Sequence, residues 1–427
     1  MNYYSLHHKS PKVSFKEAVI RGLAPDRGIY FPKNITPLSE EFIQNIHNYS
    51  HEEIAFEAIK QFVGDEIPTD VLKEIIAETL SFEFPVVPVE DNIGTLELFH
   101  GPTMAFKDVG ARFMARCLGY FNRNSDESVT VLVATSGDTG GAVANGFLGV
   151  KGVDVVILYP SGKVSEIQEK QLTTLGQNIT ALEVDGVFDD CQEMVKTAFL
   201  DAEIERTLTS ANSINIARWL PQMFYFFFAY KALHQQHKNI VFSVPSGNFG
   251  NICAGIMAQK LGLPIQHFIA ATNVNDTVSN YLQHGEYVPQ KSIATISNAM
   301  DVGNPSNFIR IQELYGNDLE TIKKHFSSYS FTDDETKAAM KSIYNQHNYI
   351  ADPHGAVGYL GLKNHNLKDA YGVFLETAHP VKFLPTVEST LRLKLDIPEQ
   401  IQEIMHKEKK AEFITDYDDL KLFLKKE

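Results

Sequence analysis

Val129-Thr-Val-Leu-Val-Ala-Thr-Ser-Gly-Asp-Thr-Gly-Gly141 places a short β-branched run directly before a glycine-containing turn. The run 129–134 is typical of a buried strand, and we expect a helix to open at Ala142. The same order recurs where the run 239–244 precedes Pro245-Ser-Gly-Asn-Phe-Gly-Asn251. Backbone N–H groups and the helix dipole suit such strand-to-helix turns to anions. Neither turn has the GxGxxG pattern of dinucleotide binding or the GxxxxGK[ST] pattern of a P-loop.

Further β-branched runs alternate with helix-length segments along the rest of the chain. They are the runs 153–159, 179–184, 265–271 and 371–375. This alternation predicts an α/β protein with parallel sheets, in which ligands bind beyond the carboxyl ends of the strands. A chain of 427 residues predicts two or three domains.

The first ninety residues are expected to form a separate helical region. Ser50 and Glu53 have the spacing of a capping box, and Thr69 is the expected N-cap of the next helix. The apolar run from Met223 to Tyr230 is far shorter than the roughly 20 residues that span a bilayer, so we expect a buried helix there.

Composition excludes several classes of partner. The formal net charge of −15 argues against nucleic acid and anionic membranes, which need clustered cations. Cys117, Cys191 and Cys253 show no CxxC spacing, which predicts no disulfide framework, no zinc site and a reducing cytoplasm. His234 and His237 have helical spacing but no third ligand nearby, so no bound metal is expected.

Lys107 lies in an apolar segment, Leu98-Phe-His-Gly-Pro-Thr-Met-Ala-Phe-Lys-Asp-Val-Gly110. Desolvation or a second nearby cation favours a neutral lysine, which is a nucleophile toward aldehydes. The alternative is a surface lysine whose stem covers apolar groups. A lysine together with two anion-binding turns favours a ligand that carries both a phosphate and an aldehyde.

These features resemble the threonine synthase family, in the bacterial and fungal branch of the fold-type-II, tryptophan synthase β-like pyridoxal-phosphate enzymes. The resemblance rests on nearly the whole chain, in the segments 22–32, 100–110, 136–140, 210–215, 244–251, 270–277, 297–301 and 377–380. It implies two open, mainly parallel sheet domains flanked by helices, plus a helical N-terminal region. The implied division is an N-terminal domain 1–92, a catalytic core 93–390 with its smaller lobe at about 100–230, and a C-terminal extension 391–427 that packs on the core.

The resemblance also implies the cofactor and its ligands. Lys107 would be the catalytic lysine that binds the aldehyde of pyridoxal 5′-phosphate, with Phe106 beside it. Gly247, Asn248, Phe249, Gly250 and Asn251 would hold the cofactor phosphate through backbone N–H groups. Thr377 would bond the pyridine nitrogen; a hydroxyl that caps its own turn is the alternative.

Asp138 stands where many relatives of the fold type have asparagine next to the cofactor's 3′ oxygen. A carboxylate beside a phenolate would be repulsive, so we expect a shared proton or a side chain that turns away.

The family substrate, O-phospho-L-homoserine, needs a second anion site. Lys163 and Arg218 are the candidates for its phosphate, with a surface position as the alternative for each. Ser136, Gly137 and Thr139 are expected to receive its α-carboxylate, and Asn215, in a further family segment, is also expected to bind the substrate.

The implied reaction converts O-phospho-L-homoserine and water to L-threonine and phosphate, with Lys107 moving the Cα proton. Two alternatives stay open: a phospholyase or dehydratase that releases 2-oxobutyrate, and a catalytically inactive binding protein of the same fold. We expect a cytoplasmic protein and favour a monomer over a dimer.

Overall fold

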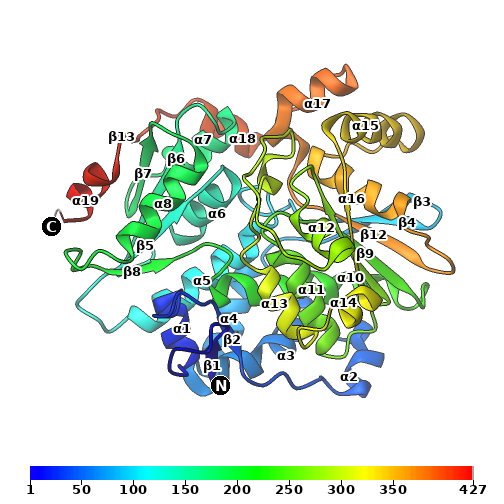
Figure 1. The fold of residues 1–427 in the computed structure, drawn as a ribbon, viewed down its shortest axis with the longest axis horizontal. Helices are drawn as coiled ribbons and strands as arrows, with labels where there is room; N and C mark the ends of the chain where they lie inside the picture. Colours follow the sequence, from blue (N-terminus) through cyan, green and yellow to red (C-terminus); the bar gives the residue numbers. More distant parts are fainter. Residues whose placement is uncertain (426–427) are drawn as a thin grey trace.

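The structure is a computed structural model that describes residues 1–425. In Figure 1 a smaller sheet with its helices lies on the left, a larger sheet lies on the right, and the N-terminal helices run along the bottom. No helix among residues 1–425 is long and apolar enough to cross a membrane.

The N-terminal region combines helices with a two-stranded antiparallel sheet. Its elements are β1 (Tyr3–Ser5), α1 (Phe15–Arg21), β2 (Tyr30–Pro32), α2 (Glu40–Gln44), η1 (Ile46–Asn48), α3 (His51–Val63), η2 (Gly64–Glu66) and α4 (Thr69–Thr79). The inward face of α3 is buried at Ile54, Ala58 and Phe62, as the periodic pattern predicts.

The smaller sheet has five strands in the order β13-β7-β6-β5-β8, and all neighbours are parallel. The strands are β5 (Val129–Ala134), β6 (Val153–Pro160), β7 (Ile179–Val184), β8 (Thr207–Ser210) and β13 (Glu412–Ile414). The helices around it are α5 (Lys107–Asn122), α6 (Asp138–Phe147), α7 (Glu166–Thr173), α8 (Phe188–Ala198), α18 (Glu399–Met405) and α19 (Tyr417–Lys425).

The larger sheet has six strands in the order β11-β10-β9-β12-β4-β3, parallel except for the edge strand β3. The strands are β3 (Val86–Glu90), β4 (Ile93–Glu97), β9 (Ile240–Pro245), β10 (His267–Thr272), β11 (Phe326–Ser330) and β12 (Tyr371–Glu376). The remaining helices are α9 (Ile216–Trp219), η3 (Leu220–Met223), α10 (Phe224–Leu233), α11 (Gly250–Lys260), α12 (Thr277–His284), η4 (Asn298–Met300), α13 (Phe308–Leu314), α14 (Leu319–His325), α15 (Asp333–His347), α16 (Pro353–Asn364), η5 (Pro380–Phe383) and α17 (Leu384–Leu391).

Helices on both faces explain why the central strands are apolar throughout. Every residue of β5, β9 and β12 is buried, as expected for parallel strands that are covered on both sides. Helix α16 packs across β9, β10 and β12. The apolar run before Tyr230 is the buried start of α10, as predicted. The α/β architecture with two open, mainly parallel sheets is therefore confirmed.

Two predicted helix starts are wrong. Helix α6 begins at Asp138 rather than at Ala142, because Gly137 makes the turn in one step with a φ of 134°. Thr69 is the first residue of α4 and not its N-cap, because Pro68 holds the extended position before the helix. The domain boundaries stay predictions. The predicted boundary at residue 92 falls inside the hairpin of β3 and β4. Strand β13, in the C-terminal extension, pairs with β7 at the edge of the smaller sheet.

The capping box of α3 gives a stability prediction. Ser50 Oγ accepts a hydrogen bond from the N–H of Glu53 at 3.1 Å, and Glu53 Oε2 accepts one from the N–H of Ser50 at 2.7 Å. We expect Ser50→Ala to lower the free energy of unfolding by about 0.5–2 kcal/mol, measured by urea denaturation. Ser50→Thr keeps the acceptor and is the control; an equal loss in both variants would rule out the cap as the cause.

Candidate active site

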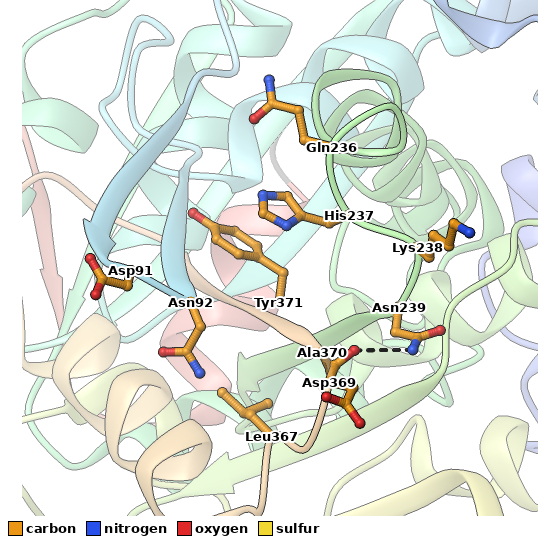
Figure 2. Close-up of a pocket in the computed structure, with 10 residues that line it drawn as sticks. All are labelled: Asp91, Asn92, Gln236, His237, Lys238, Asn239, Leu367, Asp369, Ala370 and Tyr371. Atoms are coloured by element: carbon orange, nitrogen blue, oxygen red, sulfur yellow. Dashed lines mark hydrogen bonds between the residues drawn. The ribbon is translucent and has the colours of Figure 1, made fainter.

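The depression in Figure 2 is not where the predicted chemistry lies. It has a volume of about 330 Å³, and Asn92, Asn239 and Tyr371 line it at the amino ends of β4, β9 and β12. The dashed line in Figure 2 marks the hydrogen bond that Asn239 Nδ2 donates to the Asp369 carbonyl oxygen at 3.0 Å. The predicted site residues follow the opposite, carboxyl ends of these strands.

The segment after β4 and the segment after β12 meet at those carboxyl ends. The N–H of Phe106 donates to the Thr377 carbonyl at 2.9 Å, and Ala105 and Ala378 form an antiparallel bridge. The Tyr225 hydroxyl donates to the Phe106 carbonyl from the other side. These bonds fix Lys107 as the first residue of α5, beside Thr377.

Lys107 is held in surroundings that favour its neutral form. Its side chain is 15% exposed, and Nζ lies 3.8 Å from Asp138 Oδ2. Burial lowers the pKa of the Lys107 amine; the charge of Asp138 opposes this shift, and the charges of Lys382 and Arg218 strengthen it. The structure thus supplies both the desolvation and the second cation that a nucleophilic lysine requires.

The main partner of the Asp138 carboxyl group is Lys382. Lys382 Nζ lies 2.6 Å from Asp138 Oδ1, and Gln168 Nε2 donates to the same oxygen at 2.9 Å. Burial raises the pKa of Asp138, but the charges of Lys382 and Lys107 and the bonds from Lys382 and Gln168 hold it below its usual range. A buried ammonium group thus pairs with this carboxyl group. The expectation of a shared proton or a turned-away side chain beside the cofactor's 3′ oxygen stays a prediction.

The turn after β9 presents unused backbone donors. Within residues 1–425, no hydrogen bond occupies the N–H groups of residues 247–251. Phe249 has a left-handed backbone with a φ of 60°, and α11 begins at Gly250 without a side-chain cap. A Cβ atom at Gly247 would lie 2.6 Å from the Ala299 carbonyl oxygen, so the turn is closed on that side.

The amide side chains of this turn are engaged elsewhere. Asn248 Nδ2 donates to Ser213 Oγ at 2.7 Å, and its Oδ1 accepts from the N–H of Ser306 at 2.6 Å. Asn251 Nδ2 donates to the Pro245 carbonyl at 2.9 Å. An anion would therefore be bound by the main chain, as the sequence pattern predicts.

The turn after β5 and the hydroxyl of Thr377 also carry free groups. Thr135 Oγ1 accepts from the N–H groups of Gly137 and Gly140 at 3.0 and 2.8 Å. The N–H groups of Ser136, Asp138 and Thr139 have no partner among residues 1–425. Within the same residues the Thr377 hydroxyl makes no hydrogen bond, so it does not cap its own turn.

The predicted substrate residues differ in their surroundings. Arg218 is 1% exposed; Nη1 donates to the Ala211 carbonyl, Nε has no partner among residues 1–425, and no carboxylate there pairs with the guanidinium. Burial lowers the pKa of Arg218 to about 10. Lys163 is exposed in the turn after β6.

Asn215 differs from the other predicted substrate residues because its side chain is fully hydrogen-bonded within the protein. Its Nδ2 donates to the carbonyls of Val19 and Ser210 at 2.9 and 3.0 Å, and its Oδ1 accepts from the N–H of Ala217. Its side chain ties α9 to α1. The roles given to Lys107, Arg218, Lys163, Asn215 and the two turns stay predictions.

Lys382 and Gln168 are the residues that the sequence pattern did not reveal. Lys382 lies in η5, just after the segment 377–380, and no local pattern marks it as buried. Gln168 completes a capping box with Ser165 at the start of α7, a signal that explains the helix but not the bond to Asp138. Among residues 1–425, no group of histidine, cysteine and acidic side chains is placed to hold a metal ion.

The donors fit a pyridoxal phosphate. Five free N–H groups at a helix start suit its phosphate, a lysine amine whose pKa is lowered by burial suits its aldehyde, and a free hydroxyl suits its ring nitrogen.

Family models match most of the chain. A model described as pyridoxal-phosphate dependent enzyme matches residues 95–374, threonine synthase N terminus matches 2–80, and threonine synthase C-terminal matches 355–423. Threonine synthase of Escherichia coli is 45% identical over 406 residues, which cover 94% of each chain.

Solved structures agree with these matches. The crystal structure of threonine synthase from Escherichia coli superposes with a TM-score of 0.94 and 43% identity over 99% of each chain. The pyridoxal-phosphate-bound threonine synthase from Brucella melitensis gives a TM-score of 0.94 at 35% identity, covering 99% of this chain and 98% of its own. These findings confirm the fold-type-II resemblance and the cofactor expected from the sequence. The chain belongs to the threonine synthase family of pyridoxal-phosphate-dependent enzymes.

Proposed function

We propose that the protein converts O-phospho-L-homoserine and water to L-threonine and phosphate, as a carbon–oxygen lyase acting on phosphates. One observation supports this most strongly: Lys107 lies among separate groups of free anion donors. The turn 247–251 suits the cofactor phosphate, while the N–H groups of Ser136, Asp138 and Thr139 and the Arg218 Nε have no partner among residues 1–425 and suit a substrate with its own carboxylate and phosphate.

The cofactor, when bound, supplies an electron sink for negative charge at the substrate carbons. The chain supplies the proton transfers. The Lys107 amine, whose pKa is lowered by burial and by nearby cations, takes the proton from the substrate Cα. Its flexible stem lets the same amine return that proton to the bound molecule and then take a second proton from Cβ, after which phosphate departs and the second proton is delivered to the γ carbon.

Binding groups orient the substrate for these transfers. The N–H groups of Ser136 and Thr139 at the start of α6 bind the α-carboxylate. Arg218, which has no acidic partner among residues 1–425, binds the γ-phosphate from inside the protein, and Lys163 approaches it from the solvent side.

A product assay tests the reaction directly. Purified protein with its cofactor is incubated with O-phospho-L-homoserine, and L-threonine is separated from 2-oxobutyrate by chromatography while phosphate is measured. We expect threonine and phosphate in equal amounts. Formation of 2-oxobutyrate and ammonia instead would assign the protein as a phospholyase, and the absence of any turnover would contradict both reactions.

Arg218 gives a prediction about substrate affinity. We expect Arg218→Met to raise the KM for O-phospho-L-homoserine by about 10- to 100-fold, because a charge-assisted bond to a phosphate contributes about 1.5–3 kcal/mol. Steady-state kinetics measures the effect, and the absorbance of the bound cofactor checks that the site is intact. Lys163→Met, on the exposed side, is expected to give a smaller rise. An unchanged KM in Arg218→Met would remove Arg218 from the phosphate site.

We also propose a cytoplasmic location and a monomeric state. The three cysteines are all buried free thiols, which suits a reducing compartment. Light scattering on the purified chain measures the oligomeric state.

A further inference from the structure

Three charged side chains lie in a row at the carboxyl ends of the strands. Asp138 stands between two lysines: Lys382 Nζ is 2.6 Å from Oδ1, and Lys107 Nζ is 3.8 Å from Oδ2. Both members of the Lys382–Asp138 pair are buried, with side-chain exposures of 0% and 3%. A single carboxylate thus lies between two lysine side chains that come from distant parts of the sequence.

The Asp138 carboxylate contacts Lys382 more closely than Lys107. Lys382 is within hydrogen-bond distance of Asp138 and also donates to the Thr103 carbonyl at 2.9 Å. Lys107 is beyond hydrogen-bond distance of Asp138, and its Nζ lies 5.5 Å from the centre of the Phe106 ring. Lys382 therefore has the contacts of a fixed ammonium group, whereas Lys107 has those of an amine that is free to react.

The loop around Asp138 is built to hold this pairing. Gln168 donates to Oδ1 at 2.9 Å, and it reaches that oxygen only because residue 137 is a glycine. A Cβ atom there would lie 2.4 Å from Gln168 Cδ. Asp138 is consequently held toward Lys382 by a second donor.

Without Lys382, the charge of Asp138 would favour the ammonium form of Lys107 over the neutral amine. A buried carboxylate within about 4–6 Å of an amine favours the ammonium form, which cannot attack an aldehyde. The other charged groups near Lys107 do not replace Lys382. Arg218 also adds a positive charge near Lys107, but the negative charge of Asp352 opposes it. Asp108, which lies on α5 next to Lys107, accepts a hydrogen bond from the N–H of Thr103.

We propose that Lys382 is a positioning residue: its ammonium group takes up the charge of Asp138, so that Lys107 stays free to bind the cofactor. This inference rests on the proposed role of Lys107 but not on the identity of the substrate. It also explains how an aspartate is accommodated where many relatives of the fold type have asparagine, because the carboxylate and Lys382 together form a nearly neutral pair.

Competitive labelling of the full-length, cofactor-free protein tests the proposal. Traces of acetic anhydride are added over a series from about pH 6 to about pH 11. Mass spectrometry then compares acetylation of the Lys107 peptide with that of the peptide carrying the exposed Lys394, which serves as the internal standard. The midpoint of the Lys107 curve gives its pKa without any contribution from substrate or cofactor.

Three variants predict three different curves. Lys382→Met should raise the pKa of Lys107 by at least about 1, so that labelling near pH 8 falls about tenfold. Asp138→Asn alone should lower it. The double variant Asp138→Asn/Lys382→Met removes both charges and should return labelling to within about threefold of the wild type. Lys363→Met, which removes an exposed lysine from its pair with Glu90, is the matched control and should leave the curve unchanged.

An unchanged labelling curve in Lys382→Met would overturn the proposal. If Lys382→Met changes thermal stability but leaves the labelling curve of Lys107 in place, Lys382 is only structural. If that single variant does not fold, the double variant and Asp138→Asn still decide: equal curves in wild type and Asp138→Asn would contradict the proposed balance. Failure of Lys107 to bind cofactor would appear in a separate reduction experiment and not in these curves.

Discussion

Lys107→Ala is expected to abolish turnover of O-phospho-L-homoserine, with kcat falling by at least about 1,000-fold. The variant removes both the amine that binds the cofactor and the base that moves the substrate protons, and positioned acid–base groups alone contribute about 10²- to 10⁴-fold. Lys107 is the lysine placed next to the free hydroxyl of Thr377, at the start of α5. Steady-state kinetics with separated products measures the loss.

The fold should survive this change. The Lys107 side chain makes no hydrogen bond within residues 1–425, and its charged neighbour Asp138 keeps Lys382 as partner. Circular dichroism and urea unfolding are therefore expected to stay near wild type. Lys363→Ala, at an exposed ion pair, is the matched control and should retain full activity. A Lys107→Ala protein with wild-type kcat would refute the assigned role.

Gly247→Ala is expected to weaken pyridoxal phosphate binding by about 100-fold, which corresponds to about 2.7 kcal/mol. A Cβ atom at this position would lie 2.6 Å from the Ala299 carbonyl oxygen and 2.7 Å from Met300 Cα. Both neighbours are backbone atoms, and the N–H of Ala299 is itself bonded to His354 Nε2 at 3.2 Å. The contact is relieved only by a shift of the turn that presents the phosphate donors.

Gly250→Ala in the same turn is the graded comparison. There the added Cβ would meet Asn307 Nδ2 at 3.3 Å and Ser213 Cβ at 3.4 Å, so a small adjustment is enough. We expect a loss of affinity well below that of Gly247→Ala, measured by absorbance titration with the cofactor. Equal affinities in wild type and Gly247→Ala would contradict the placement of the phosphate in this turn.

The sequence predicted those parts of the site that are formed by residues adjacent in the chain. The strand β5 and the turns after β5 and β9 follow from β-branched runs next to glycines, which is why the positions of Asp138 and Gly247 at strand ends could be predicted. The start of α6 could not, because it depends on the positive φ of Gly137. Local patterns do not report such backbone angles.

Contacts between distant segments were not predictable from one sequence. The lysine segment predicted desolvation or a second nearby cation at Lys107, but only the folded chain brings Lys382 to Asp138. Arg218 was recognised by its segment, whereas its burial without an acidic partner in the described chain is a consequence of helix packing against Gly110. Asn215 was also chosen from its segment, but in the folded chain its side-chain amide holds α9 against α1.

Reduction of the cofactor-loaded protein with sodium borohydride, followed by digestion and mass spectrometry, tests the central assignment most directly. The reagent fixes the cofactor permanently to the lysine that holds it. We predict a single labelled peptide with the modification on Lys107. A label on the neighbouring Lys382, or on any other lysine, would contradict the account.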